Sequence, residues 1–413
     1  MDRKVAITGL GVVSPLGVGI KELEESLRGN RVGVGKITHF EPSEDFPVKI
    51  AAQVDGFDPT AFMDKKTARR YDKVLQFAIA AAKMAVEDSG IEFDEKSKER
   101  TAVLVTSGIG GFTTLWTEAK KYLQYGPSKV SPFLVPMMLP DMSSGVVSME
   151  FGLKGANFSP VSACASSTHS IILGTIFIEL GLADIAIVGG AEASITELSI
   201  AAFASMRALS TRNDEPKKSS RPFDKGRDGF VMGEGGAVLV LERLDQARSR
   251  GARIYGIVKG YGMTGDAYHL SAPDPEGIGA AKAMSLALEK ANLPPEAVQY
   301  VNAHATGTPV GDKAELKAVK RVMGEHAPKV MVNSTKALGG HLLGAAGSFE
   351  VVSSIVMMNS GFVHGNPNLE DPDDECVGVD VLGNEVRKCE IENLISNSFG
   401  FGGHNASILI GRK

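Results

Sequence analysis

Short apolar runs that are rich in β-branched residues and bounded by glycine recur along the chain, and this pattern predicts buried β-strands. They lie at residues 5–8, 101–106, 185–188, 237–241, 255–260, 330–334, 394–396 and 407–410. Between them, apolar residues recur at helical spacing, most clearly over residues 68–89, where Gly90 offers a C-terminal stop. Further helices are predicted at residues 166–180, 279–291, 313–323 and 348–358.

Strands that alternate with helices are typical of an α/β protein whose sheet is largely parallel. The rhythm restarts after the charged stretch 242–253. An early strand of each half ends in a similar motif, Gly9-Leu-Gly11 in the first half and Gly260-Tyr-Gly262 in the second. The sequence thus indicates a weak internal duplication, with no flexible linker between the halves.

Composition narrows the class of protein. The chain has 413 residues, of which 43% are hydrophobic and 23% charged, and its formal net charge of -5 offers no general attraction to nucleic acid or to an anionic membrane. Two apolar segments, 5–13 and 171–188, imitate a targeting signal and a membrane span. Glycines interrupt the first, and Glu179 and Asp184 interrupt the second. We therefore expect a soluble cytoplasmic protein.

Three cysteines are present, and their spacing forms neither a CxxC pair nor an even-numbered disulfide framework, which favours a reducing compartment and indicates no zinc site. Cys164 stands apart because it lies in Val161-Ser-Ala-Cys-Ala-Ser-Ser-Thr-His169, just before a predicted helix. Small neighbours leave room for a second molecule at the sulfur, and the N–H groups of a helix N-terminus favour a thiolate. A lone cysteine in such a turn is more often a buried structural thiol, so the functional interpretation depends on partners elsewhere.

Two histidines supply such partners. His304 follows a strand-like segment in Val301-Asn-Ala-His-Ala-Thr-Gly-Thr-Pro309, and His341 lies in the glycine-rich run 334–348. Each alone would often be a structural histidine, but the small residues around them allow another molecule to approach. A thiol with two imidazoles that manage charge indicates a cysteine-nucleophile enzyme.

Charged residues near these segments have two interpretations. Lys336 and Glu350 would ordinarily be solvated, but they fall in or beside an uncharged stretch, where a buried pair would hold His341 neutral. The basic run 65–70 is normally a solvated helix face, and its functional interpretation is a docking surface for an acidic protein. Glycine-rich segments at 32–36 and 233–236 lack the full spacing of a phosphate loop or a dinucleotide-binding motif.

With Cys164, His304 and His341 in this order, the chain resembles the β-ketoacyl-acyl carrier protein synthases of the elongating type, most closely the synthase II subgroup. The resemblance covers essentially the whole chain. It is carried by Ala163-Cys-Ala-Ser-Ser167, Gly189-Gly-Ala-Glu192, Arg207-Ala-Leu-Ser-Thr-Arg-Asn213, Arg221-Pro-Phe-Asp-Lys225, Arg227-Asp-Gly-Phe-Val231, Asn302-Ala-His304, Gly311-Asp-Lys-Ala-Glu315, residues 336–347 and Asn397-Ser-Phe-Gly-Phe-Gly-Gly403.

The resemblance implies a thiolase-like α/β fold with two similar halves, each with a five-stranded mixed sheet, in α-β-α-β-α layers. The first half, 1–253, would carry Cys164, and the second, 254–413, would carry both histidines. The resemblance also implies a homodimer that acts on acyl carrier protein. No cofactor or metal is expected, because the pantetheine arm arrives on the carrier protein, and no nucleic acid or membrane partner is implied.

The resemblance further implies a reaction. Cys164 would take the acyl chain as a thioester, with the backbone N–H groups of Cys164 and Phe401 as the oxyanion hole. Malonyl carrier protein would then lose carbon dioxide, and its carbanion would attack the acyl group. Neutral His304 and His341 would stabilise the enolate oxygen, and such donors are each worth ~3 kcal/mol in a preorganised site. The expected product is 3-oxoacyl-acyl carrier protein in fatty acid elongation.

The resemblance also implies roles for residues around this centre. Lys336 and Glu350 would support the histidines, Thr306 and Thr308 would hold the pantetheine arm, and Phe401 would gate the acyl pocket. Further pocket residues would be Ile109, Phe203 and Phe399, and the residues that dock the carrier protein would be Lys65, Arg69 and Arg207.

Four places depart from the family pattern and leave the acyl chain length open. They are Ala305 in place of glycine, Ala337-Leu-Gly-Gly340 in place of Ser-Met-Thr-Gly, His404 in place of threonine, and Leu134 in place of an aromatic residue. Three alternatives remain. A polyketide ketosynthase would use the same chemistry. A non-catalytic chain-length partner would lack Cys164, and a thiolase would need a second cysteine near the glycine-rich segment 400–403.

Overall fold

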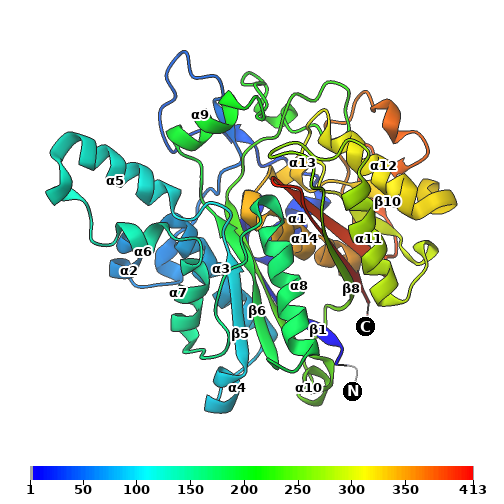
Figure 1. Ribbon diagram of the computed structural model, residues 1–413, viewed down its shortest axis with the longest axis horizontal. Coiled ribbons are helices and arrows are strands. Elements are labelled where there is room, and N and C mark those ends of the chain that lie inside the picture. The colour runs from blue at the N-terminus through cyan, green and yellow to red at the C-terminus, as the bar shows by residue number, and fades with distance from the viewer. Residues whose placement is uncertain (1–2, 413) are drawn as a thin grey trace.

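The fold is organised around one mixed sheet that runs through the whole molecule (Figure 1). The computed structural model describes residues 3–412. The strands of the first half are β1 (Val5–Ser14), β2 (Gly17–Val18), β5 (Thr101–Thr106), β6 (Ile185–Glu192) and β7 (Gly235–Arg243). The strands of the second half are β8 (Gly256–Gly265), β9 (Tyr300–Asn302), β10 (Met331–Asn333), β12 (Asp380–Val381), β14 (Asn393–Gly400) and β15 (His404–Gly411). Within the described residues their order is β12-β10-β9-β14-β15-β8-β1-β7-β6-β5, with β2 paired to β1.

The two halves of the sheet join where β1 pairs with β8. The two strands are antiparallel, and Val5, Ala6 and Ile7 lie opposite Val258, Ile257 and Gly256. The expectation of two separate five-stranded sheets is therefore corrected to one continuous sheet. The second half also has a sixth strand among the described residues, because the two-residue β12 pairs with β10 at the outer edge.

Strand direction differs between the centre and the ends of the sheet. Parallel pairs occur at the two ends, between β5 and β6 and among β14, β9, β10 and β12. The strands from β6 through β7, β1, β8 and β15 to β14 pair antiparallel. The sheet is mixed, as the family resemblance implied, and the expectation of a largely parallel sheet was wrong. One reason is that β14 and β15 form a hairpin, which requires antiparallel strands.

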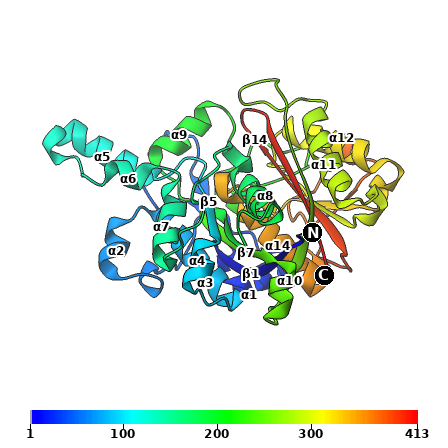
Figure 2. The ribbon, with the colours of Figure 1, turned by 60° about the horizontal axis from the view of Figure 1, so that its bottom comes forward.

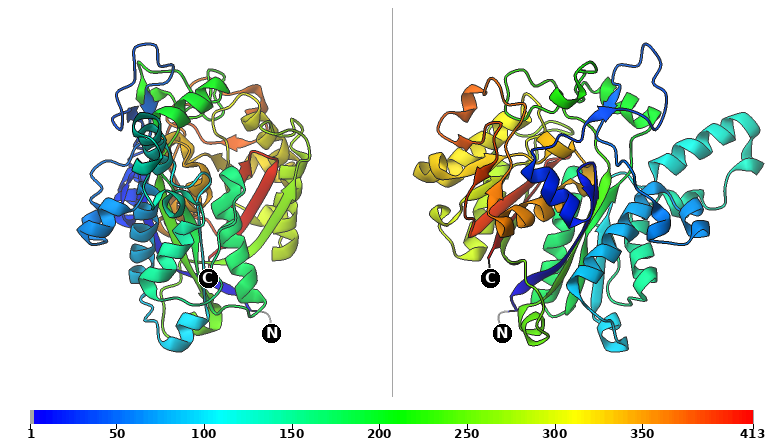
Figure 3. Two further views of the ribbon diagram at one scale, coloured as in Figure 1. Left: turned by 60° about the vertical axis from the view of Figure 1, so that its left-hand side comes forward. Right: turned by 180° about the vertical axis from the view of Figure 1, so that it is seen from behind.

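Helices complete five layers (Figures 1 and 3). The outer face of the first half is covered by α3 (Lys73–Ser89) and α7 (Met142–Phe151), and that of the second by α11 (Ile278–Ala291) and α12 (Gly311–Met323). Between the halves lie α8 (Ser166–Glu179) and α14 (Ala346–Ser360). Residues 346–358 of α14 are all buried, as expected for a helix enclosed by other layers. The predicted α-β-α-β-α arrangement is confirmed.

The two Gly-x-Gly motifs pack in the same way against a helix in each half. A Cβ at Gly9 or Gly11 would lie 2.1 or 1.9 Å from alanine carbonyl oxygens of α3, so β1 contacts that helix directly through its backbone. A Cβ at Gly260 or Gly262 would lie 2.0 Å from alanine carbonyl oxygens of α11. The motif that indicated an internal duplication thus marks equivalent close contacts between a strand and a helix.

The predicted helix over residues 68–89 is interrupted. A short helix, α2 (Lys65–Arg70), ends before Tyr71, and α3 begins again after Asp72, whose side chain accepts a hydrogen bond from the Val74 N–H. An aspartate that caps a new helix favours this break over a continuous helix. Predicted helices 166–180, 279–291, 313–323 and 348–358 correspond to α8, α11, α12 and α14.

One helix that the sequence pattern did not reveal projects from the body of the molecule (Figures 1 and 2). This is α5 (Phe112–Tyr125), in which only Glu118 is buried. Its apolar residues do recur at helical spacing, but none of them is buried, so this periodicity does not mark a helix that faces the core. Across residues 3–412, no helix has both the length and the apolar character that a membrane span requires.

Candidate active site

Cys164 lies on a tight turn directly before α8. The turn is the 3-10 segment η3 (Ala163–Ala165), and Ala163 has a φ of 51°, a left-handed conformation that is uncommon for a residue with a Cβ. Gly400, at the end of β14, packs against this turn, since a Cβ there would lie 2.6 Å from the Ser162 carbonyl oxygen. The nucleophile candidate is therefore held between a central helix of the first half and a strand of the second.

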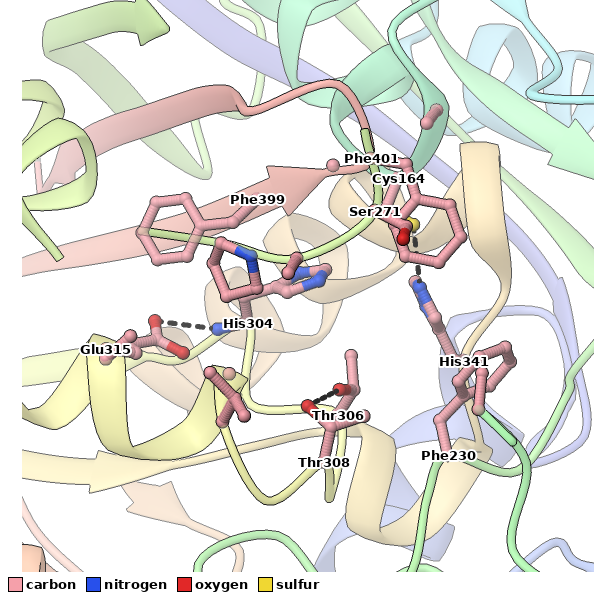
Figure 4. A pocket seen from close by; sticks show the side chains of 18 of the residues that line it. Cys164, Phe230, Ser271, His304, Thr306, Thr308, Glu315, His341, Phe399 and Phe401 are labelled. Carbon is pink, nitrogen blue, oxygen red and sulfur yellow. Dashed lines mark hydrogen bonds between the residues drawn. The ribbon is translucent and has the colours of Figure 1, made fainter. Parts of the chain in front are cut away.

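His341 approaches the sulfur from the second half. Its backbone N–H donates to the Val231 carbonyl oxygen at 2.8 Å, and its own carbonyl accepts from the Gly233 N–H at 2.8 Å. These two bonds fix the backbone, and the ring Nε2 lies 3.0 Å from the Cys164 sulfur (Figure 4). The short turn that follows, η7 (Leu343–Ala345), leads into α14 and contains Leu343 at a φ of 47°. Both central helices are thus preceded by a residue with a left-handed backbone.

His304 follows β9 and is held by a carboxylate. The N–H groups of His304 and Ala305 donate to Glu315 at 2.9 and 2.7 Å, and the Asn397 side chain donates to the same carboxylate at 3.1 Å. The ring of His304 meets that of His341 edge-on, with centroids 5.4 Å apart. Ligand-type atoms of Cys164, His304 and His341 lie within 4.8 Å of one another, so the structure brings the predicted trio together.

Both imidazoles are neutral because they are buried. Burial lowers the pKa of His304 and of His341 well below the usual value, and the nearby Lys336 ammonium lowers both pKa values further. Among the described residues, Nδ1 of each ring has no hydrogen-bond partner. No anchored partner fixes which ring nitrogen carries the proton, so Nε2 of His341 can accept a proton in one step and donate in another.

The thiol is also neutral at rest. Burial raises the pKa of Cys164 to about 12, although Lys336 and a hydrogen bond from the Phe401 backbone N–H both lower it. The sequence indicated only the N-terminus of α8, which favours a thiolate, and burial of the sulfur acts in the opposite direction. The proton must therefore leave as the sulfur attacks, and His341 Nε2 is placed to accept it.

Lys336 and Glu350 form the buried pair that the sequence allowed. Lys336 begins the short helix α13 (Lys336–Gly339), and its Nζ contacts Oε1 of Glu350 on α14. The side chains are 2% and 1% exposed. Burial raises the pKa of Glu350 to about 7, with Lys336 opposing the shift. The pair places a positive charge beside the trio without exposing it to water.

A cavity of about 500 Å³ opens onto the sulfur. Its wall combines aromatic rings and two threonines, and Thr306 Oγ1 donates to Thr308 Oγ1 at 3.2 Å. The predicted residues that line it are Cys164, His304, His341, Ile109, Phe203, Thr306, Thr308, Phe399, Phe401 and Arg207. All six predicted pocket residues thus meet at one cavity.

The predicted docking residues fall into two places. Arg207 lines the cavity and follows α9 (Glu197–Ser205). Lys65 and Arg69 are exposed on α2 and do not line the cavity. The neighbouring Arg70 stacks on Phe133 at 4.7 Å, and Figures 1 and 2 place α2 beside α6 (Leu134–Met138), away from α9.

Two buried carboxyl groups at the site were not predicted from the sequence. Burial raises the pKa of Glu315, which holds the His304 loop, to about 7. Glu192 accepts hydrogen bonds from Ser107 Oγ at 2.8 Å and from the N–H groups of Gly108 and Gly344 at 2.9 and 3.1 Å. Each lies in a motif that carried the family resemblance, Gly311-Asp-Lys-Ala-Glu315 and Gly189-Gly-Ala-Glu192, which was the available signal. Most of their partners are backbone N–H groups, which leave no further pattern in the sequence.

A buried thiol bonded to a neutral imidazole, with a second imidazole beside it where two similar halves meet, defines a cysteine-dependent enzyme of thiolase-like fold. Residues 2–247 match the family model of the beta-ketoacyl synthase N-terminal domain, and residues 255–370 match that of the beta-ketoacyl synthase C-terminal domain. The chain belongs to the beta-ketoacyl synthase family.

Named relatives and solved structures agree with this membership. The chain is 46% identical over 410 residues to 3-oxoacyl-[acyl-carrier-protein] synthase 2 of Coxiella burnetii, covering 99% of each chain. It is 45% identical over 412 residues to the protein of the same name in Staphylococcus aureus strain COL, covering 100% of this chain and 99% of that one.

Two solved structures, each matched over 100% of both chains, share the fold. One is a beta-ketoacyl synthase from Burkholderia phymatum, with a TM-score of 0.91 and 35% identity. The other is the ishigamide ketosynthase/chain length factor, with a TM-score of 0.93 and 32% identity.

Proposed function

We propose that this chain condenses malonyl-acyl carrier protein with an acyl group held on Cys164, releasing carbon dioxide and 3-oxoacyl-acyl carrier protein in fatty acid elongation. The observation that carries the proposal is the trio itself, with a thiol and two neutral imidazoles in contact at the floor of one cavity. A hydrolase would need one base and a path for water. Two neutral donors at one point suit an enolate oxygen instead.

The first step is transfer of the acyl group. The Cys164 sulfur attacks the carbonyl carbon of the acyl thioester on acyl carrier protein, and its proton passes to His341 Nε2 at 3.0 Å. The backbone N–H groups of Cys164 and Phe401 stabilise the oxyanion, and the Phe401 N–H already bonds to the sulfur. The departing pantetheine sulfur takes the proton from His341, so this step leaves no net change in charge.

The second step forms the carbon–carbon bond. Nε2–H groups of His304 and His341 donate to the malonyl thioester oxygen, which becomes an enolate oxygen as carbon dioxide leaves. The enolate carbon attacks the acyl carbonyl, and the Cys164 sulfur departs as a thiolate. One proton from solvent then restores the thiol, because the malonyl carboxylate leaves as carbon dioxide and supplies none. Lys336 supports this step, because its charge lowers the pKa of both rings and keeps them neutral.

The cavity and its rim supply substrate contacts. Thr306 and Thr308 would hold the pantetheine arm, while Ile109, Phe203 and Phe399 would surround the acyl chain and Phe401 would gate it. Arg207 at the cavity would meet the acidic carrier protein. Lys65 and Arg69, on a separate surface of the chain, would form a second basic contact for the carrier protein. The enzyme would act as a homodimer in the cytoplasm without a resident cofactor.

A polyketide ketosynthase is the second candidate. A solved structure titled as a type II PKS acyl-carrier protein in complex with its ketosynthase has a TM-score of 0.92 and 28% identity to this chain, and each chain is covered completely. The 44–46% identity to proteins named 3-oxoacyl-[acyl-carrier-protein] synthase 2 favours fatty acid elongation. A non-catalytic chain-length partner is disfavoured, because the complete trio is in place.

The test is a condensation assay with acyl carrier proteins of several chain lengths and labelled malonyl carrier protein. We expect 3-oxoacyl product from the wild type. Cys164→Ala should lose acyl transfer but still release carbon dioxide from malonyl carrier protein, whereas His304→Ala should lose that release. Failure to condense any acyl length would refute the proposal, and the reverse variant pattern would exchange the assigned roles.

A further inference from the structure

The trio of Cys164, His304 and His341 also has the composition of a zinc-binding site. One sulfur and two imidazole nitrogens lie within 4.8 Å of one another. Thiolate and imidazole are preferred ligands of Zn²⁺ and Co²⁺, and three protein ligands with one open position is a common zinc arrangement. The spacing of residues in the sequence does not indicate this metal site, because its three ligands come from distant segments.

We propose that the free enzyme binds one Zn²⁺ ion at this trio, and that the ion blocks the nucleophile and inhibits condensation reversibly. The binding rests on the geometry of the three side chains alone. The inhibition rests on the function proposed above, in which Cys164 carries the acyl group.

The distances are close to those that a tetrahedral ion requires. Bonds of ~2.0 Å to nitrogen and ~2.3 Å to sulfur set the ligand atoms roughly 3.3–3.6 Å apart. The Cys164 sulfur and His341 Nε2 are 3.0 Å apart, and His304 lies within the 4.8 Å limit of the trio. Small side-chain rotations therefore bring all three atoms to bonding distance.

The surroundings admit an ion and a fourth ligand. The cavity of about 500 Å³ that opens onto Cys164 leaves room for a water molecule at the open position. On binding, the thiol proton is released and the sulfur bonds to the metal as a thiolate, with no change in oxidation state. The product is a zinc–thiolate bond and one free proton.

Buried ionisable groups of both signs surround the trio. Glu315 bonds to the His304 backbone, and Glu192 and Glu350 act electrostatically on the Cys164 thiol. The buried positive charge that acts on the trio is Lys336, which Glu350 already pairs. Three carboxyl groups and one ammonium group therefore lie around the trio.

The hydrogen-bond partners of the ring nitrogens that do not bind the metal explain why such an ion would be removable. Histidines that hold a resident metal usually donate their other ring N–H to a carboxylate or carbonyl group. Among the residues that the structure describes, Nδ1 of His304 and Nδ1 of His341 have no such partner. Loss of these contacts typically lowers metal affinity about 10–100-fold, so a chelator should extract the ion.

The test is titration of the full-length chain with Co²⁺, followed by the near-ultraviolet band of a cobalt–thiolate bond and by displacement with Zn²⁺. We expect one equivalent of Co²⁺ to produce the band in the wild type. Cys164→Ser should abolish it, and His304→Ala and His341→Ala should each weaken binding at least ~10-fold. Cys376→Ser and Cys389→Ser are the matched controls, because these thiols lie outside the trio, and both should retain the band.

A second sample guards against variants that fail to fold. Wild-type protein whose Cys164 has been alkylated should show no band. A band that survives alkylation or Cys164→Ser, or disappears in Cys389→Ser, would place the metal elsewhere and overturn the proposal, as would no band in the wild type.

Inhibition is measured separately. Zn²⁺ should suppress condensation, and EDTA should restore it. Full activity with the trio saturated by metal would overturn the inhibitory role. Absence of condensation in metal-free buffer would instead count against the proposed function, and the cobalt titration would still report on the site.

Discussion

Nε2 of His341 lies 3.0 Å from the sulfur of Cys164, although 177 residues separate them in the sequence. Burial raises the pKa of the thiol and lowers the pKa of the imidazole, so both partners are neutral before substrate binds. A neutral pair avoids the cost of an isolated charge in an apolar cavity, and charge appears only as the sulfur attacks.

The raised thiol pKa predicts how Cys164 responds to alkylation. Only the thiolate reacts, and below a pKa of about 12 its fraction rises about tenfold per pH unit. The rate of inactivation by iodoacetamide should therefore climb throughout the range from about pH 7 to pH 10, whereas unfolded protein should level off above its ordinary thiol pKa of about 8.5. A plateau below about pH 9 in the folded enzyme would show that the thiol is more acidic than its burial implies.

The buried pair of Lys336 and Glu350 predicts that the effects of mutating the two residues are not additive. Lys336→Met leaves Glu350 without its partner, and Glu350→Gln leaves the ammonium unpaired, so each should lower the free energy of unfolding by about 3–5 kcal/mol. The double variant Lys336→Met/Glu350→Leu removes both charges and should be less destabilised than either single variant. Chemical denaturation measures this, and additive losses would contradict a coupled pair.

The same lysine has a catalytic consequence. Lys336 lowers the pKa of both imidazoles, so its removal raises their pKa values. In Lys336→Met, the fall of decarboxylation at acidic pH should begin at a higher pH than in the wild type. Release of carbon dioxide from malonyl carrier protein, measured against pH, tests this. An unchanged acid limb would mean that Lys336 acts only on stability.

A close backbone contact beside the cavity predicts a steric effect. A Cβ at Gly344 would lie 2.1 Å from the Gly108 nitrogen, next to the pocket residue Ile109. Gly344→Ala should lower the free energy of unfolding by about 1–3 kcal/mol or more and reduce condensation. Gly383→Ala is the control, since a Cβ there meets nothing within 4 Å. Equal stability of the two variants would mean that the backbone yields freely at residue 108.

The position of Arg207 at the cavity predicts a charge effect on the partner. Arg207→Glu should raise KM for malonyl carrier protein on the order of tenfold at low salt, with little change for a malonyl-pantetheine substrate that lacks the protein. Arg248→Glu, on the exposed helix α10 (Leu244–Ser249), makes the same charge change at the opposite end of the molecule (Figure 1). Equal effects of both variants would point to net charge instead of docking.

The sequence was most informative where side chains face a uniform environment. The buried strand at 101–106 matches β5, and the enclosed helix at 166–180 matches α8 to within one residue. Burial on all sides leaves an apolar run that needs no knowledge of distant neighbours. By contrast, α5 has little buried surface, and the break at Tyr71 depends on how Asp72 caps α3.

The candidate site was likewise predicted only in part. Cys164, His304 and His341 were identified because thiol and imidazole groups are few and lie in unusual small-residue loops. The burial that raises the pKa of Cys164 was not predicted, because desolvation depends on residues that pack over the sulfur from remote segments. Glu192 and Glu315 were missed as site residues for a related reason, since their partners are mainly backbone N–H groups that no sequence pattern records.

The pairing of β1 with β8 has a consequence for how this enzyme can vary over evolution. Main-chain hydrogen bonds run without interruption from β14, which ends beside the nucleophile turn, to β6, which leads to Glu192. The turn that carries Cys164 packs on one end of this ladder through Gly400, and Glu192 lies at the other end, so the frame around the site is held by bonds that do not depend on side-chain identity. Mutations that change the side chains of the acyl pocket can accumulate on this scaffold without breaking its main-chain hydrogen bonds. The range of accepted acyl chains can therefore change while the catalytic residues stay in place.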